Sequence, residues 1–515
     1  MIAQVVPILR LRRDTTWWSY AVPSKAICAP GSLVRIPFRS RSYLGIVWHL
    51  EATDEKASKS IEEVLTPGPL VRAPARALIE YLSQVGLCSL STALYQWLPS
   101  GLRRYPLTPP IRALISRYAG WRPPGELPPQ HCILVPGERP RQTAELREKF
   151  SSRFQELFSQ NNELQELRNW FAIATGKITV GLGRERALWA PWLNLREMTV
   201  VEPEDISFYH EQTPYLNLVP AAREAARISK ASLHFRSYLP PDTGRELWEE
   251  DTLGRNAPPA LRVIDTSHQP LLNDELVEAI RSTLNRGQTV LILYNAHDRA
   301  ALITRQGVPE RVVLPGIETI AKRLAHRLGY SQLPPEVRIG TRSILHQPID
   351  RLGLAVILSL DPLLRQTVFA DRLHNFTDLG RLFALPVPCV IQASQMDHPL
   401  IQALRQSRLD AYVLECVREQ RHLRLPPFGQ YVVCSIPQDA LTVETAHALY
   451  RRLVDITQTE WKISYPFSAV WRKKEYIHLL LQTPSTDTRL PTAIRSVLIQ
   501  LPRPWKVQHN PWYLL

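Results

Sequence analysis

Residues 177–205 read KITVGLGRERALWAPWLNLREMTVVEPED, and this stretch determines the fold class. Two short apolar runs within it, Lys177–Val180 and Met198–Val201, are typical of β-strands, and helix-forming residues lie between them. Strands that alternate with helices indicate βαβ units, which build a mainly parallel sheet. We therefore predict an α/β domain around this segment.

The same alternation extends in both directions and predicts two α/β lobes, at residues 131–245 and 260–424. In the first lobe, a strand at Cys132–Pro136 precedes a charged helix at Arg141–Leu167. A proline-rich break at 239–260 separates the lobes. The strands predicted for the second lobe are Leu261–Val263, Thr289–Leu293, Arg311–Leu314, Val337–Ile339, Leu354–Leu358 and Val387–Gln392.

Three further regions complete the predicted domain organisation. Residues 1–104 contain alternating segments and turn residues, which predict a small β-rich domain. Residues 105–130 contain seven prolines and are predicted to form a linker with one short helix. Residues 425–515 mix strand and helix patterns, as an α+β domain does.

The charge of the chain is unevenly distributed. The 515 residues carry 62 Lys and Arg against 48 Asp and Glu, a net charge of +14. The first fifty residues alone hold seven of these cations and one acid, Asp14. Such an excess suggests a polyanionic partner or a membrane surface, and its position indicates the N-terminal domain as the contact.

Glycine is scarce, at 21 residues, and proline is abundant, at 44. A phosphate-binding loop needs the pattern G-x-x-x-x-G-K-[ST], because small residues let backbone N–H groups converge on the phosphates. No such string occurs, and Gly176-Lys177 lacks the upstream glycine. The sequence therefore predicts no site for a nucleoside triphosphate.

Other classes of protein are excluded by simple patterns. The N-terminus lacks the features of a secretory signal, and no run of 18 apolar residues predicts a membrane span. The six cysteines form no C-x-x-C pair, so we expect reduced thiols, a cytoplasmic location, and neither disulfides nor structural zinc.

Aromatic residues lie among the N-terminal cations, and this pattern is typical of a surface that binds single-stranded nucleic acid. Arginines contact phosphates, and aromatic faces stack on unpaired bases. The alternative is that the aromatic residues form the core and the arginines a solvated face. The aromatic residues are Trp17, Trp18, Tyr20, Phe38 and Tyr43, and the cations are Arg10, Arg12, Arg13, Lys25, Arg35, Arg39 and Arg41.

Four N-terminal segments match a known family in order: Trp18–Pro23, Pro30–Phe38, Ser42–Val47 and Lys59–Leu65. They resemble the DNA-binding domain of the primosomal replication-restart helicase family (primosomal protein N′, PriA). That domain holds the 3′-terminal nucleotide of a nascent strand. The resemblance implies these DNA-binding residues: Trp18, Ser19, Tyr20, Arg35, Arg39, Arg41 and Lys59.

Substitutions in the implied nucleotide pocket weaken strict 3′-end recognition. Trp18 replaces a family phenylalanine and keeps a stacking face, and Lys59 is retained. Ser19 replaces an aspartate and loses a charged acceptor for a terminal hydroxyl. Arg39 replaces a glycine, which crowds the pocket and adds a phosphate contact. Binding to forked or single-stranded DNA without sequence preference is expected instead.

The lobes also resemble the family, with departures at its catalytic motifs. His131–Pro136, Val180–Pro191 and Ile339–Arg342 are similar to segments of two RecA-like helicase lobes. The phosphate loop is missing, as is the winged helix that precedes it, and the linker takes their place. The lobe 2 motif that supplies an arginine finger is missing too, so Arg381 is expected to be a surface residue. A short loop at 296–309 replaces the zinc-binding cysteines.

Val200–Asp205 falls where the family has its Asp-Glu-Glu-His box. Three acids remain there, Glu202, Glu204 and Asp205, and we expect them to be solvated at a strand end and not catalytic. No cofactor is predicted, although the family uses ATP and zinc.

We therefore predict a DNA-binding primosomal protein that recognises forked or single-stranded DNA without hydrolysing ATP. The resemblance implies that single-strand-binding protein and helicase-loading proteins are partners. Two alternatives stay open. One is an active 3′→5′ helicase with divergent motifs, and the other is a protein-interaction scaffold that no longer contacts DNA.

Overall fold

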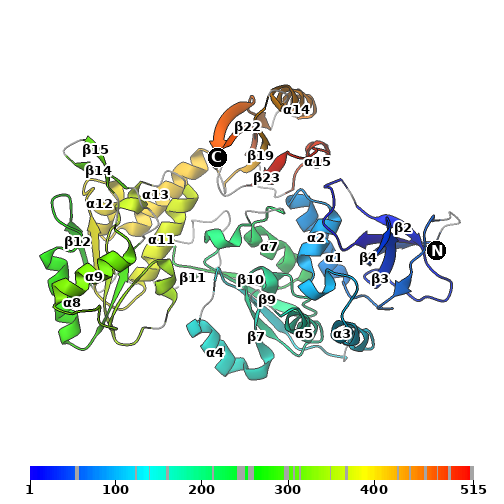
Figure 1. The fold of residues 1–515 in the computed structure, drawn as a ribbon, viewed down its shortest axis with the longest axis horizontal. Helices are drawn as coiled ribbons and strands as arrows, with labels where there is room; N and C mark the ends of the chain where they lie inside the picture. Colours follow the sequence, from blue (N-terminus) through cyan, green and yellow to red (C-terminus); the bar gives the residue numbers. More distant parts are fainter. Residues whose placement is uncertain are drawn as a thin grey trace.

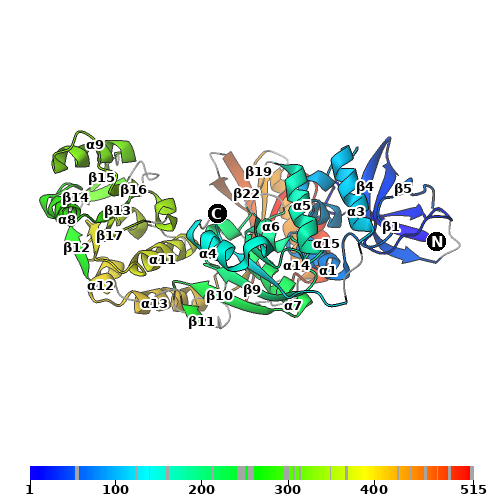
Figure 2. The same ribbon diagram turned by 90° about the horizontal axis from the view of Figure 1, so that it is seen from below.

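The computed structural model describes the chain apart from residues 15, 53–56, 122–124, 138–139, 158–161, 211–213, 240–249, 253–259, 295–300, 306–307, 313–314, 348, 366–368, 426–427, 440–441, 458–460, 472–473, 485–488 and 511–515. The N-terminal domain and the second lobe lie at opposite ends of an elongated molecule, and the first lobe lies between them (Figures 1 and 2).

The N-terminal domain is built on a five-stranded antiparallel sheet with the order β2-β1-β4-β3-β5. Residues 59–65 join its two edges, because Ile61 donates its N–H to Ala21, the last residue of β2, and Leu65 donates to Leu33 on β3. The sheet is thereby closed into a small barrel. The strands are β1 (Ile2–Pro7), β2 (Trp18–Ala21), β3 (Leu33–Phe38), β4 (Arg41–Glu51) and β5 (Glu63–Val64).

Alternation along the barrel strands separates two apolar faces. The inner face contains Val5, Tyr20 and Ile36, whereas the outer face, with Ile46 and Trp48, packs against helices. The indole N–H of Trp48 donates to a carboxylate oxygen of Glu80, at 2.7 Å. The helices that pack against the outer face are α1 (Ala73–Val85) and α2 (Leu90–Trp97).

The outer face of the barrel, helices α1 and α2 and the first lobe share one hydrophobic core, which runs from Val6 to Phe235. Helix α3 (Pro109–Ala119) lies in the predicted linker and contributes buried residues to this core. The ring of Tyr118 on α3 lies 4.5 Å from that of Phe171. Residues 109–119 are therefore packed structure and not an extended tether.

The first lobe is a six-stranded parallel sheet with the order β11-β10-β9-β6-β8-β7. Its strands are β6 (Gln130–Leu134), β7 (Phe154–Leu157), β8 (Val180–Gly183), β9 (Leu195–Val201), β10 (Ser232–Ser237) and β11 (Glu250–Thr252). Its helices are α4 (Pro140–Phe150), α5 (Glu163–Ala174), α6 (Glu185–Leu188) and α7 (Leu218–Ser229).

Two local predictions in this lobe are wrong. The charged helix expected at 141–167 is interrupted by β7, because pairing with β8 at the sheet edge outweighs the local helical pattern. The strand expected at 177–180 begins only at Val180 and continues through Gly181 and Gly183. Those glycines suit the close approach of β7, since a Cβ on Gly183 would lie 2.3 Å from the carbonyl oxygen of Leu157.

The second lobe is a five-stranded parallel sheet with the order β12-β18-β17-β13-β16. Its strands are β12 (Leu261–Asp265), β13 (Thr289–Leu293), β16 (Val337–Gly340), β17 (Leu352–Ile357) and β18 (Cys389–Ala393). Its helices are α8 (Asp274–Asn285), α9 (Ile317–Leu328), α10 (Asp361–Leu364), α11 (Phe369–Phe383), α12 (Pro399–Arg405) and α13 (Leu409–His422).

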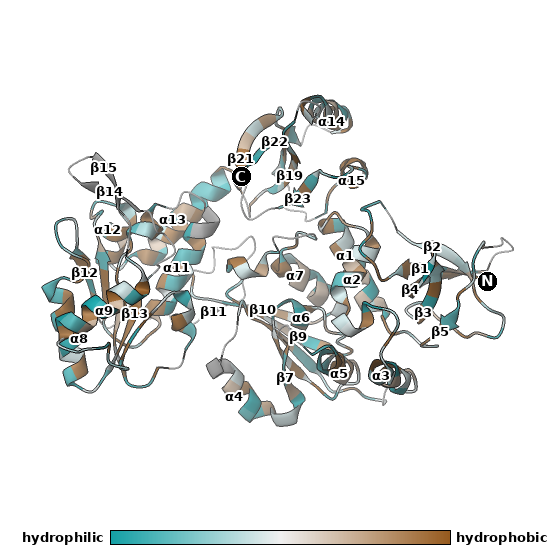
Figure 3. Ribbon diagram, in the orientation of Figure 1, coloured by the Kyte–Doolittle hydropathy of each residue, from teal (hydrophilic) through white to brown (hydrophobic). Residues whose placement is uncertain are grey.

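Five of the six strands predicted for this lobe overlap the sheet strands. The prediction at 311–314 overlaps β15 (Val308–Val312), which pairs with β14 (Ala301–Arg305) in a separate antiparallel hairpin. This hairpin occupies the described part of the short segment that was expected in place of a zinc module. Hydrophobic and hydrophilic residues alternate around the helices of both lobes, as helices that cover a sheet require (Figure 3).

The C-terminal α+β domain rests on the N-terminal part of the chain. Arg13 donates to the carbonyl of Trp505 at 3.0 Å, and Leu87 belongs to the core of this domain. Part of the Pro426–Gly429 segment, and Trp512 and Tyr513, lie outside the described residues. The elements are β19 (Gln430–Pro437), α14 (Thr442–Ile456), β20 (Lys462–Ile463), β21 (Phe467–Trp471), β22 (Lys474–Thr483), α15 (Thr492–Ile499) and β23 (Lys506–His509).

No helix in the described parts of the chain is both long and apolar enough to cross a bilayer.

The tight contact between β7 and β8 generates a first prediction. Gly183→Ala would push its new methyl group against the backbone of Leu157, and we expect a loss of about 1–3 kcal/mol in the free energy of unfolding. The measurement is calorimetric unfolding. Gly125→Ala is the control, because nothing lies within 4 Å of a Cβ at that position. Equal effects of the two changes would contradict the packing assigned to β7.

Candidate functional site

Three aromatic rings gather at one end of the barrel. The ring of Trp18, on β2, lies 4.8 Å from that of Phe38, which ends β3, in an edge-to-face arrangement. The ring of Tyr43, on β4, lies 6.0 Å from Phe38 in the same geometry. All three side chains are half-buried, so part of each ring faces solvent. We call these three residues, with Arg39 and Arg41, the barrel mouth.

Two arginines flank this aromatic group from the turn between β3 and β4. Arg39 and Arg41 are both exposed, and the guanidinium of Arg39 lies 5.8 Å from the Phe38 ring centroid. Arg39 has a φ of 54°, a left-handed conformation that favours glycine. A glycine at this position of the family is therefore understandable from the backbone alone, and its replacement places a cation beside the rings.

Two other predicted contacts, Ser19 and Lys59, are also exposed. The carbonyl of Lys59 accepts the N–H of Ala21 at 2.8 Å, which places Lys59 beside the end of β2. Both residues thus lie on or next to the strand that carries Trp18.

The structure places the remaining two predicted contacts differently. Tyr20 is only 2% exposed inside the barrel, where its hydroxyl donates to the carbonyl of Pro37 at 3.1 Å. Burial raises the pKa of Tyr20 to about 12, so the hydroxyl stays protonated. Arg35 forms ion pairs with Glu62 and Glu63, at 2.8 and 3.1 Å. Tyr20 therefore supports the barrel, and the charge of Arg35 is already balanced.

A second polar site lies at the carboxyl edge of the first sheet. Residues 202–205, the acidic segment, follow β9 directly, and Ser237 ends the neighbouring strand β10. The carboxyl edge is where ligands bind in open α/β sheets. The predicted solvation of these acids is wrong, because Glu202, Glu204 and Asp205 are 2%, 5% and 7% exposed.

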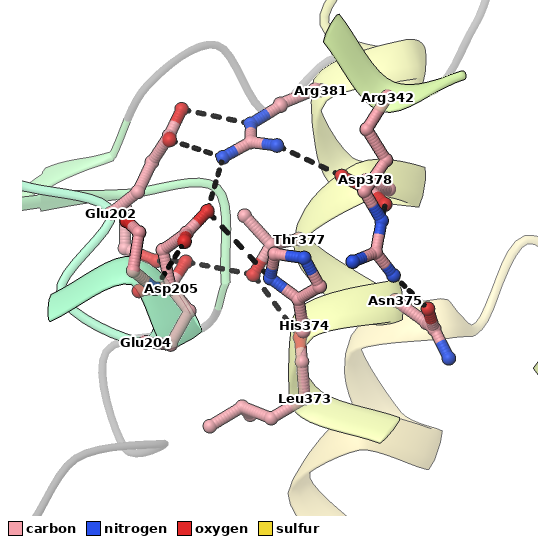
Figure 4. Close-up of polar contacts among 12 residues, drawn as sticks. Glu202, Glu204, Asp205, Arg342, Leu373, His374, Asn375, Thr377, Asp378 and Arg381 are labelled. Carbon is pink, nitrogen blue, oxygen red and sulfur yellow. Dashed lines mark hydrogen bonds and ion pairs between the residues drawn. The ribbon is translucent and has the colours of Figure 1, made fainter. Parts of the chain in front are cut away.

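Helix α11 of the second lobe covers the acidic segment (Figure 4). Arg381 donates through Nε to Glu202 at 2.9 Å, and its Nη2 contacts both the other oxygen of Glu202 and Asp205. Its Nη1 donates to Asp378 at 2.8 Å. The side chain of Arg381 is 4% exposed, so the expectation of a surface arginine is also wrong.

Glu202 is held in an unfavourable backbone conformation at this contact. Its φ is 53°, in the left-handed region that non-glycine residues rarely adopt. Such conformations persist where the surroundings determine them, and here a two-point pair to Arg381 fixes the carboxylate. Removing one partner of a buried ion pair costs about 3–5 kcal/mol, because the other charge stays buried.

Glu204 is also buried, and its pKa is shifted upward. One carboxyl oxygen accepts hydrogen bonds from Ser237 at 2.8 Å and Thr377 at 2.9 Å. Burial raises the pKa of Glu204 to about 7, and the negative charge of Glu202 acts in the same direction. Glu204 therefore keeps its proton to a higher pH than an exposed glutamate does.

Asp205 remains ionised. Burial pushes its pKa upward, but His374, the N–H of Ser207 and Arg381 together hold the pKa of Asp205 below its ordinary value. His374 lies 3.6 Å from the Asp205 carboxylate, and burial lowers the pKa of His374.

A second arginine extends the cluster within the second lobe. Arg342 forms an ion pair with Asp378 and donates to the amide oxygen of Asn375 at 2.7 Å. We use the term interlobe cluster for Glu202, Glu204, Asp205, Arg342, His374, Asn375, Thr377, Asp378 and Arg381.

These acids do not fit a magnesium–nucleotide complex. A ligating carboxylate must be ionised and must offer a lone pair to the metal. Glu202 is paired with Arg381 at both oxygens, and burial raises the pKa of Glu204 to about 7, which disfavours its ionised form. Among the described residues, no group of three or more His, Cys, Asp or Glu could hold a metal ion, which covers zinc as well.

Sequence reasoning missed the partners of the acidic segment, although α11 carries a signal. His374, Thr377, Asp378 and Arg381 recur at helical spacing and form a polar stripe beside the apolar residues of that helix. Such a stripe normally predicts a solvent-facing surface. Only the contact with the first lobe makes it a buried face.

The raised pKa of Glu204 generates a prediction with a definite sign. An unfolded glutamate titrates near 4.3, so between that pH and about 7 the native state keeps a proton that the unfolded state releases. Stability therefore falls as pH rises through this window. Glu204→Gln removes the titration, and its stability relative to the wild type should increase between pH 5 and pH 8 by about 3 kcal/mol.

The measurement compares urea unfolding of the two proteins at each pH, so that His374 and other groups cancel. Glu224→Gln is the control, because a hydrogen bond from Arg227 lowers the pKa of Glu224 and that carboxylate is ionised throughout the window. The control should be equally destabilised at pH 5 and pH 8. A constant difference for Glu204→Gln would contradict the raised pKa.

Comparison with known proteins identifies the N-terminal domain. Residues 8–99 match the family model of the PriA 3′ DNA-binding domain. This match includes the barrel mouth, α1 and α2. No curated protein matches the chain.

Solved structures resemble the chain only weakly. A point variant of Saccharomyces cerevisiae Dbp5, bound to RNA and ADP BeF3, is 13% identical, with a TM-score of 0.34 over 62% of this chain and 87% of that one. The DUF1998 helicase MrfA bound to DNA and AMPPNP is 11% identical, with a TM-score of 0.34 over 56% of this chain and 44% of that one. The chain is thus similar to PriA in its N-terminal 3′ DNA-binding domain, which precedes two parallel α/β lobes.

Proposed function

We propose that this protein binds forked or single-stranded DNA through the barrel mouth, in replication restart, and that it does so without hydrolysing ATP. The observation that carries the proposal is the group of half-exposed rings, Trp18, Phe38 and Tyr43, within a domain of the 3′ DNA-binding family. Exposed Arg39 and Arg41 flank the rings.

The chemistry of the barrel mouth suits unpaired DNA. An unpaired base has two free faces, and a half-exposed aromatic ring offers a surface on which one of them stacks. Arg39 and Arg41 add phosphate contacts that do not depend on sequence. Ser19 supplies a weak acceptor where the family has a carboxylate, so we propose that a terminal hydroxyl is not strictly required.

The interlobe cluster supports the absence of ATP hydrolysis. Phosphoryl transfer needs a cradle for the phosphates, a metal site and a charged group that stabilises the transition state. No phosphate-loop sequence is present, and the acids that remain are paired with Arg381, Ser237 and Thr377. The lobes then act as a scaffold that carries the barrel, and single-strand-binding and helicase-loading proteins are the partners we propose.

DNA binding is tested with the full chain and a fluorescent forked DNA at several salt concentrations. Trp18→Leu keeps the packing at the mouth but removes the stacking face, and we expect a loss of about 1–3 kcal/mol, or roughly 5- to 150-fold in Kd. Arg39→Gln should reduce the slope of log K against log salt by about one.

Arg117→Gln is the matched control, because Arg117 is an exposed arginine on α3 and does not belong to the barrel mouth. We expect it to leave both the Kd and the salt slope unchanged. If Trp18→Leu and Arg39→Gln bind DNA as the wild type does, the mouth is not the DNA site and the scaffold alternative is favoured.

ATP turnover is measured separately, with and without forked DNA. We expect no turnover above the background of the buffer. DNA-stimulated turnover that is lost in Glu204→Gln would overturn this part of the proposal and would indicate an active helicase, whatever the DNA-binding result.

A further inference from the structure

The contact between the lobes combines ionic, hydrogen-bonded and apolar interactions at one place. Arg381 and Thr377 of α11 reach Glu202 and Glu204 of the first lobe. Leu239, which follows β10, is 2% exposed and belongs to the hydrophobic core of the second lobe. The junction therefore combines a buried polar contact and a buried apolar contact between the lobes.

The backbones at this junction approach each other as closely as packing allows. A Cβ on Gly380 would lie 2.7 Å from the Cβ of Tyr238 and 3.1 Å from its carbonyl oxygen. Glycine is thus required here by space and not by backbone conformation. Gly380 immediately precedes Arg381, so the close approach and the ion pair occur in the same turn of α11.

The charges of Arg381 and Glu202 are satisfied from within the chain. All three guanidinium nitrogens of Arg381 are engaged, with Glu202, Asp205 and Asp378. Both oxygens of Glu202 are engaged in return. A phosphate could not reach Arg381 without displacing carboxylates from two elements in different lobes.

We propose that the interlobe cluster is a permanent clamp that holds the two lobes in one relative orientation without any ligand, with the guanidinium of Arg381 as its internal cation. This inference goes beyond the proposed function, because it concerns how the lobes are held and not what the barrel binds. Lobes that close on a nucleotide change orientation when it binds, whereas the clamped lobes keep one orientation.

The clamp is tested by measuring the distance between the lobes in the full chain with paired spin labels. Exposed Glu148 on α4 and Lys322 on α9 are changed to cysteine to carry the labels, and Cys28, which is half-buried, is changed to serine. The other five cysteines are buried. Figure 2 shows α4 and α9 in the two different lobes. We expect one narrow distance distribution, unchanged by magnesium with ATP or a non-hydrolysable analogue.

Two single variants break the clamp in different ways. Arg381→Gln removes the cation and leaves Glu202 unpaired, and Gly380→Ala separates the backbones but keeps every charge. Both should broaden the distance distribution and add longer distances. Arg338→Gln, an exposed arginine of β16, is the matched control and should leave the distribution narrow.

A double variant without either charge distinguishes loss of the clamp from misfolding of a single variant. Circular dichroism would reveal such misfolding. Glu202→Gln with Arg381→Gln removes both charges, and we expect it to recover much of the narrow distribution that Arg381→Gln loses. The clamp is overturned if the wild-type distance changes with magnesium–ATP, or if the lobes keep their narrow distribution in folded Arg381→Gln. DNA binding at the barrel mouth is a separate readout, so failure of the clamp is distinguishable from failure of the proposed function.

Discussion

The buried pair between Arg381 and Glu202 is the interaction on which the arrangement of the lobes depends. A charge removed from water is costly unless an opposite charge and further hydrogen bonds replace its hydration. Here the two lobes supply the two halves of that replacement, and neither half is stable alone in a buried position. Asp205 and Asp378 complete the shell around the guanidinium. The interface is thus specified by charge as well as by shape.

This arrangement changes how the acids of the acidic segment are interpreted. Acids at the carboxyl edge of a parallel sheet are candidates for metal or nucleotide binding on position alone. Burial, pairing and the raised pKa of Glu204 favour a structural role for them. The barrel mouth shows the opposite case. Its rings remain half-exposed, and its five residues include two exposed arginines and no acidic residue.

Local patterns predicted much of the fold. Two parallel α/β lobes follow from strands that alternate with helices, and the strand at 289–293 is found at the predicted bounds. The errors arise where contacts between segments that are distant in sequence determine the local structure. Strand β7 forms because β8 lies beside it, and Tyr20 points into the barrel because residues 59–65 close the sheet. The polar stripe of α11 is buried because an acidic segment some 170 residues away lies against it.

The unbroken core that joins the barrel to the first lobe has a mechanical consequence. Because Val6 and Phe235 belong to one packed cluster, the barrel has no hinge of its own and takes its direction from the first lobe. The ion pair passes that direction on to the second lobe. The protein would then fix both the distance and the angle between a DNA end held at the mouth and the second lobe.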